Sequence, residues 1–187
     1  VILVPGGAFG PSKCWPSRRF SELADWLIEN HNATVVVSVA PNQVEKQIAD
    51  EICNTAKNNL INLAHNFVTL GELKAIFSIS ELTITNDTGP RHIATALERK
   101  VVTLFGPNDP AWTETNYPNE IQIVGNVACA PCARPTCKQR EHLCMKSITT
   151  EIVKQAAKEL LENNRAHAVV FAKEKLPDRS GAFFIDT

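Results

Sequence analysis

The sequence predicts an α/β fold in which a parallel β-sheet carries helices on both of its faces. Short runs of aliphatic and β-branched residues alternate along the chain with longer segments whose apolar residues recur every three or four positions. Two of the short runs end in glycine-containing turns that lead directly into helix-like segments. The chain has 187 residues, which is enough for one substantial hydrophobic core.

Six strands are expected, and each is a short apolar run bounded by polar or turn-forming residues. In chain order they occupy residues 1–4, 33–39, 60–63, 82–85, 101–104 and 121–124. Because these runs alternate with helical segments, the strands should be parallel and joined by right-handed crossovers.

Five helices are expected, each with an apolar stripe on one side. The stripes fall within residues 17–28, 44–56, 69–77, 90–97 and 152–161. The third helix opens with the spacing of a capping box, formed by Thr69 and Glu72. We expect residues 1–164 to form one domain and residues 165–187 to form a C-terminal tail, with residues 183–185 as its candidate docking segment.

Charge and hydropathy exclude several classes of function. The net charge of −1 gives no electrostatic basis for binding nucleic acid, so no nucleic-acid partner is expected. No apolar run approaches the roughly 20 residues that span a bilayer, and the sequence opens on a strand rather than on a secretory signal pattern. We therefore expect a cytoplasmic location, with peripheral attachment at the inner face of the membrane as a second option.

The most informative motif is Asn-Asp-Thr-Gly-Pro-Arg-His at residues 86–92, between an expected strand and an expected helix. Such a turn lies at the carboxyl end of a parallel strand, where these sheets bind ligands. Gly89 permits close backbone approach, and Pro90 suits a first helical turn. The free N–H groups of that turn favour an anion such as a pyrophosphate, with Asp87 and His92 beside it. The same residue types also serve as ordinary helix N-caps, so the motif alone leaves both interpretations open.

A second turn of this kind follows the first expected strand, at residues 5–13. The glycines Gly6 and Gly7 let backbone amides face a phosphate, and Lys13 supplies a positive charge. The order of residues differs from the Walker loop and from GxGxxG. Two glycine-containing turns at strand ends, one with a lysine and one with an aspartate and a histidine, favour a nucleotide-diphosphate site.

Together, residues 5–16, 86–92 and 104–107 resemble the C-terminal domain of glycosyltransferase family 9, the family of the lipopolysaccharide heptosyltransferases. The resemblance runs from Val1 to about Leu161. It implies a Rossmann-like domain that is one half of a two-domain GT-B fold and that holds a nucleotide-sugar donor. The partners it implies are an ADP-heptose-like nucleotide sugar and, through an N-terminal domain outside this sequence, a glycan or lipid-linked acceptor.

The resemblance also implies roles for individual residues. Lys13 would contact the donor phosphates, Asp87 would bind sugar hydroxyls, and Glu45 is the nearest acid for a ribose hydroxyl. The full set of expected donor-binding residues is Gly6, Gly7, Lys13, Glu45, Asp87, Thr88, Gly89 and His92. Alanine at Lys13 or Asp87 is expected to weaken donor binding with little loss of stability. No catalytic residue is assigned, because the general base is expected on the N-terminal domain; the chain by itself would be incomplete for catalysis.

Four cysteines lie close together in the sequence, at Cys129, Cys132, Cys137 and Cys144. The first two have the spacing of a zinc-ligand pair, but the last two do not. Structural zinc, disulfides and free thiols in a folded loop all remain open. No other cofactor is expected.

Three functions fit these features. The first is the donor-binding domain of a heptosyltransferase-like enzyme of lipopolysaccharide core or related glycan synthesis. The second is another GT-B-like nucleotide-sugar enzyme, such as an epimerase, which would need further carboxylates near the anomeric carbon. The third is a non-catalytic nucleotide-binding module.

Overall fold

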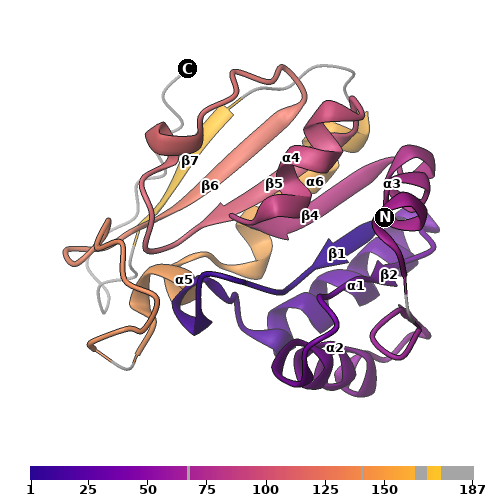
Figure 1. Cartoon of the computed structure of the whole chain (residues 1–187). Helices are drawn as coiled ribbons and strands as arrows, with labels where there is room; N and C mark the ends of the chain where they lie inside the picture. Colours follow the sequence, from indigo (N-terminus) through magenta and orange to yellow (C-terminus); the bar gives the residue numbers. More distant parts are fainter. Residues whose placement is uncertain (67, 140, 163–167, 174–187) are drawn as a thin grey trace.

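The computed structural model contains a seven-stranded parallel sheet with the strand order β3-β2-β1-β4-β5-β6-β7 (Figure 1). The structure describes residues 1–66, 68–139, 141–162 and 168–173. The strands are β1 (Ile2–Val4), β2 (Val36–Val37), β3 (Ile61–Asn62), β4 (Leu82–Asn86), β5 (Lys100–Phe105), β6 (Glu120–Asn126) and β7 (Ala168–Lys173). Every neighbouring pair is parallel, which confirms the predicted fold class.

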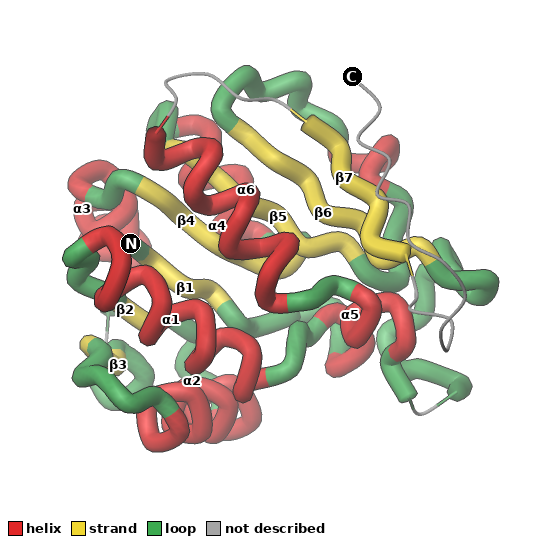
Figure 2. Tube along the Cα trace, turned by 180° about the vertical axis from the view of Figure 1, so that it is seen from behind, coloured by secondary structure: helices red, strands yellow, loops and turns green. Residues whose placement is uncertain are grey.

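Helices cover both faces of this sheet. They are α1 (Ser17–His31), α2 (Gln43–Thr55), α3 (Leu70–Ile79), α4 (Gly89–Ala96), α5 (Leu143–Ser147) and α6 (Thr150–Glu162), with short 3₁₀ helices η1 (Pro11–Lys13) and η2 (Pro110–Thr113). The helices α1 and α6 cross the face seen in Figure 2, and α4 crosses the face seen in Figure 1. No helix among these described segments combines the length and apolar character that a membrane span requires.

Alternate residues of the strands build a separate core on each face, as expected for a sheet buried on both sides. Leu3 packs with the apolar stripes of α1, α2 and α6, whereas its neighbours Ile2 and Val4 pack with Phe77 of α3 and Ala94 of α4. The predicted capping box is present at the start of α3: Thr69 Oγ1 accepts from the Glu72 amide at 3.2 Å, and the Thr69 amide donates to Glu72 Oε2 at 2.8 Å.

The structure departs from the expectation at the end of the chain. Residues 168–173, which the sequence analysis assigned to a C-terminal tail, form β7 and pair with residues 121–126 of β6. Residues 168–172 form an apolar run with adjacent valines that is typical of a strand, but the run lies within a C-terminal segment that is otherwise rich in charged residues, and its strand signal was missed. The short helix α5 was also not expected. The candidate docking segment at residues 183–185 lies outside the described residues.

The strand order places a binding crevice at one point of the sheet. The chain winds from β1 outward to β2 and β3, and then returns to place β4 on the other side of β1. In sheets of this type, ligands bind outside the carboxyl ends of the strands where the order reverses. That point lies between β1 and β4, whose following loops are the two glycine-containing turns identified in the sequence.

Candidate functional site

Asn86, the last residue of β4, joins the two loops. Its amide Nδ2 donates to Pro5 O at 2.7 Å and to Gly6 O at 3.1 Å, and its Oδ1 accepts from the Trp15 amide at 3.4 Å. Asn86 is fully buried. A buried side-chain amide that bonds three backbone groups fixes the distance between both loops. This role of Asn86 is not visible in its own motif, because its partners lie in the loop between β1 and α1.

Lys13 and Asp87 form an ion pair between the two loops. Lys13 Nζ lies 2.5 Å from Asp87 Oδ2 and 2.8 Å from Asp87 O. Asn108, in the loop after β5, donates from Nδ2 to the same Oδ2 at 3.2 Å. The ring of Phe9 lies 5.0 Å from Lys13 Nζ, within the range of a cation–π contact. The sequence predicted separate phosphate and sugar roles for Lys13 and Asp87, and the structure shows that each also neutralises the other.

A cavity of about 400 Å³ opens at the carboxyl ends of β1 to β4. The two glycine loops contribute Gly6, Gly7, Thr88 and Gly89 to one side of it. The opposite side is apolar and comes from the loops after β2 and β3 and from the start of α3: Val39, Leu63, Ala64, Val68, Leu70 and Leu73. A nucleoside diphosphate has the same division, with a flat apolar base at one end and charged phosphates at the other.

Glu45, in the first turn of α2, also lines this cavity. Its carboxylate Oε2 accepts from the Ala40 amide at 2.9 Å, and only 8% of the residue is exposed. Gly6 allows this placement, because a Cβ at that position would lie 2.0 Å from Glu45 Oε2. By contrast, a Cβ at Gly89 would meet no atom within 4 Å, so the first turn of α4 is open on that side.

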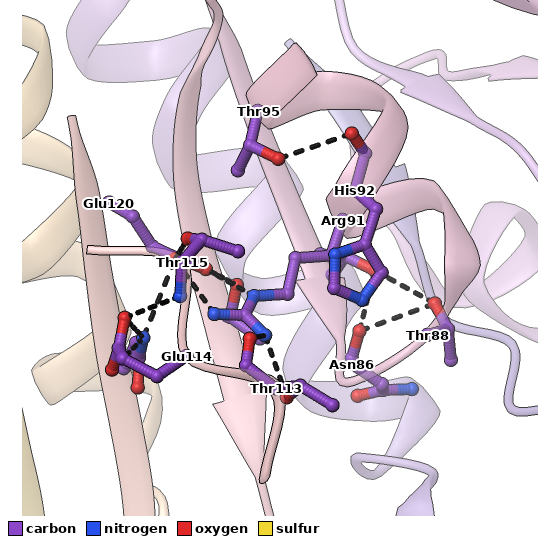
Figure 3. Close-up of polar contacts among 12 residues, drawn as sticks. Asn86, Thr88, Arg91, His92, Thr95, Thr113, Glu114, Thr115 and Glu120 are labelled. Atoms are coloured by element: carbon purple, nitrogen blue, oxygen red, sulfur yellow. Dashed lines mark hydrogen bonds and ion pairs between the residues drawn. The ribbon is translucent and has the colours of Figure 1, made fainter. Parts of the chain in front are cut away.

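The cavity therefore brings together five of the eight predicted donor-binding residues: Gly6, Gly7, Glu45, Thr88 and Gly89. Lys13 and Asp87 form the adjoining ion pair. His92 does not line the cavity; it is exposed on the first turn of α4, which also carries Thr88 as its N-cap (Figure 3). Asn108 is a further member of the site that the sequence did not single out.

The cysteine-rich loop braces both sides of the site. The amide of Ser12 donates to Pro135 O at 3.2 Å, next to Lys13. The amides of Cys132 and Ala133 donate to Pro107 O at 2.9 Å and 2.7 Å, next to Asn108. The loop between β6 and α5 thus holds the loop after β1 and the loop after β5 by backbone hydrogen bonds.

All six cysteines are free thiols, and the four in this loop differ in exposure. Cys129 and Cys132 are exposed, whereas Cys144 is buried. Burial, with a smaller contribution from the neighbouring thiols of Cys129, Cys132 and Cys137, raises the pKa of the Cys144 thiol to about 11. Across the described part of the chain, no three Cys, His, Asp or Glu side chains are arranged to hold a metal ion. Structural zinc stays a prediction from spacing.

Thiol labelling should separate these cysteines. At pH 8, iodoacetamide should modify Cys129 and Cys132 first and Cys144 last, because the thiolate is the reactive form and burial disfavours it. Peptide mass spectrometry after timed quenching measures the order. Protection of Cys129 and Cys132 that a chelator removes would show instead that a metal holds this loop.

Comparison with known proteins gives a consistent assignment. Residues 1–143 match the profile of the family described as glycosyltransferase family 9 (heptosyltransferase). Lipooligosaccharide heptosyltransferase 2 of Campylobacter jejuni is 30% identical over 165 residues, which cover 87% of this chain and 51% of the relative.

Two solved structures share the fold. The E. coli ADP-heptose lps heptosyltransferase II is 26% identical with a TM-score of 0.71, over 86% of this chain and 46% of that one. A family 9 glycosyl transferase from Veillonella parvula is 25% identical with a TM-score of 0.73, over 87% and 46%. The chain spans about half the length of the relatives it matches. By its sequence and its fold, the chain belongs to glycosyltransferase family 9.

Proposed function

We propose that this chain is the donor-binding half of a heptosyltransferase-like glycosyltransferase of lipopolysaccharide core or related glycan synthesis. Its donor would be an ADP-linked heptose or a similar sugar nucleotide. The observation that carries this proposal is the cavity at the reversal point of the sheet, with an apolar wall, a buried carboxylate at Glu45 and an open helix N-terminus at Gly89. The solved E. coli relative is named for ADP-heptose, which agrees with this chemistry.

The nucleoside would occupy the apolar side of the cavity. Aliphatic side chains such as Val39 and Leu73 can pack against the faces of a purine ring. Glu45, between this wall and the glycine loop, would accept hydrogen bonds from the two ribose hydroxyls. Charge-assisted hydrogen bonds of this kind are stronger than neutral ones and fix the ribose orientation.

The diphosphate would lie against the first turn of α4. The Gly89 amide belongs to the first turn of the helix, where N–H groups lack helical partners, and the helix dipole favours negative charge there. Lys13 lies on the facing loop and would neutralise charge that develops on the leaving diphosphate. Asp87, held by Lys13 and Asn108, would accept from hydroxyls of the transferred sugar.

The chemistry that follows is substitution at the anomeric carbon. An acceptor hydroxyl attacks that carbon, the bond to the diphosphate breaks, and ADP leaves with the electron pair. The proton of the acceptor passes to a general base, which we assign to the N-terminal half outside this sequence. The residues of this chain bind the donor and stabilise the departing charge.

Calorimetric titration with ADP tests the proposal directly. Glu45→Gln should weaken ADP binding about tenfold, because a charged hydrogen bond contributes roughly 1.5–3 kcal/mol. Glutamine still offers an oxygen to the Ala40 amide, so the loop after β2 should keep its conformation.

The matched control for this variant is 2′,3′-dideoxy-ADP, which lacks the ribose hydroxyls. Wild type and Glu45→Gln should bind it equally. An equal loss with both nucleotides would contradict the ribose role of Glu45, and a wild-type chain that binds neither nucleotide would contradict the proposed function.

A further inference from the structure

A buried ion pair lies beneath the helix that carries the proposed diphosphate site. Arg91 is the third residue of α4, and its side chain reaches the first residue of β6 (Figure 3). Arg91 Nε lies 2.6 Å from Glu120 Oε1, and Arg91 Nη2 donates to Glu120 Oε2 at 2.9 Å. Both side chains are 0% exposed.

The pair also holds the segment that contains η2. Arg91 Nη1 donates to Thr113 O at 2.8 Å and to Thr113 Oγ1 at 2.9 Å. Glu120 accepts from the hydroxyls of Thr103, at 2.5 Å, and Thr115, at 3.4 Å. The guanidinium lies 5.1 Å from the ring centroid of Phe105. Three separate segments, α4, β5 with its following loop, and β6, therefore meet at one guanidinium.

Stability alone does not account for this arrangement. A buried ion pair costs so much desolvation that apolar residues of similar volume often replace it without loss. A bidentate ion pair with two further hydrogen bonds allows only one orientation of the arginine side chain. Apolar packing does not fix the orientation of a side chain in this way. The segments that it orients are those on which the site depends.

The two ends of this network reach the site. The three residues that precede Arg91, at positions 88–90, line the cavity. Thr113 and Thr115 belong to the segment of residues 108–115, which begins with Asn108; the Asn108 amide contacts Asp87 Oδ2 at 3.2 Å. A shift of the arginine would therefore move the diphosphate-binding turn relative to the carboxylate of Asp87.

We propose that Arg91 and Glu120 are positioning residues that hold the first turn of α4 and the 108–115 segment in the geometry that binds a diphosphate. The inference rests on the proposed function of the cavity. It assigns a role to two residues that touch no donor atom. Their effect should be confined to the phosphate end of the nucleotide, because Glu45 and the apolar wall belong to other elements.

The double variant Arg91→Met/Glu120→Gln of the 187-residue chain tests this role. Neither charge remains unpaired in it, so it should stay folded. Calorimetry should show about tenfold weaker binding of ADP and unchanged binding of adenosine. An equal loss of affinity for ADP and adenosine would indicate that the whole site is disordered and would overturn the proposal. Unchanged binding of both ligands would overturn it too.

A milder pair of variants keeps the test decisive if the double variant does not fold. Thr113→Val removes one acceptor of Arg91 and should weaken ADP binding about threefold, again without an effect on adenosine. Thr95→Val makes the same change on α4 at a hydroxyl whose hydrogen bond within the described residues is to His92 O of its own helix, and this variant should bind ADP like wild type. Equal ADP affinity of the Thr113→Val and Thr95→Val variants would overturn the proposal. If the wild-type chain binds neither ADP nor adenosine, the proposed function fails instead.

Discussion

Replacement of Asp87 by Asn should lower the free energy of unfolding by about 2–3 kcal/mol, slightly less than the loss on breaking a fully buried pair. The reason is the ion pair with Lys13, whose Nζ lies 2.5 Å from Asp87 Oδ2. The side chains of Lys13 and Asp87 are only 10% and 6% exposed. The variant would leave a nearly buried ammonium group without its counter-charge. Urea unfolding followed by circular dichroism measures the change.

If Asp87 accepts from the sugar hydroxyls as proposed, the same variant should weaken binding of an intact ADP-linked sugar about tenfold to a hundredfold. Lys13→Met should weaken binding of free ADP as well as of the sugar nucleotide, since the proposed role of the lysine is at the phosphates. Calorimetric titration of both variants with ADP and with the sugar nucleotide separates these two effects.

Lys13→Met is also the control for stability, and its cost should be smaller. Asp87 would keep its hydrogen bond from Asn108, and it lies just before α4, where the helix dipole favours a carboxylate. The double variant Lys13→Met/Asp87→Asn should lose less than the sum of the single variants, since the pair is removed together. An Asp87→Asn protein as stable as wild type would contradict the structural role of the pair.

Lys13 and Asp87 were both recognised as site residues, because each follows a strand in a glycine-containing turn. Their substitution was expected to cost little stability, and that expectation treated them as independent. Nothing in the local pattern shows that residues of two separate loops share a hydrogen bond; the contact arises because β1 and β4, which precede these loops, are neighbours in the sheet.

The same limit applies to the rest of the site. Arg91 was identified only as a member of the motif, since its partner Glu120 lies on β6 and its second partner Thr113 lies in η2. Asn86 and Asn108 were missed for the same reason. In the fold, all six expected strands and the capping box of α3 were predicted, because those signals are local. The edge strand β7 was not, because the apolar run at residues 168–172 was included in a segment interpreted as a C-terminal tail.

Gly10→Ala should be among the most damaging single changes in the site loops, lowering the free energy of unfolding by about 3 kcal/mol. Gly10 has φ 150° and ψ 172°, a conformation almost confined to glycine. An added Cβ would also lie 2.4 Å from Pro135 O, which is backbone and cannot move aside like a flexible side chain. This contact is part of the interface between the loop after β1 and the cysteine-rich loop, so ADP affinity should fall together with stability.

Gly89→Ala is the matched control, because it makes the same chemical change in the other glycine turn. A Cβ at Gly89 meets no atom within 4 Å, so this variant should unfold at the same urea concentration as wild type. It should nevertheless bind ADP more weakly, since the methyl group enters the space beside the first turn of α4 that we assign to the diphosphate. A loss of stability in Gly10→Ala but not in Gly89→Ala would show that the contact with Pro135 supports the fold, whereas Gly89 serves binding. Equal stability of the two variants would show that the contact with Pro135 does not hold the loop.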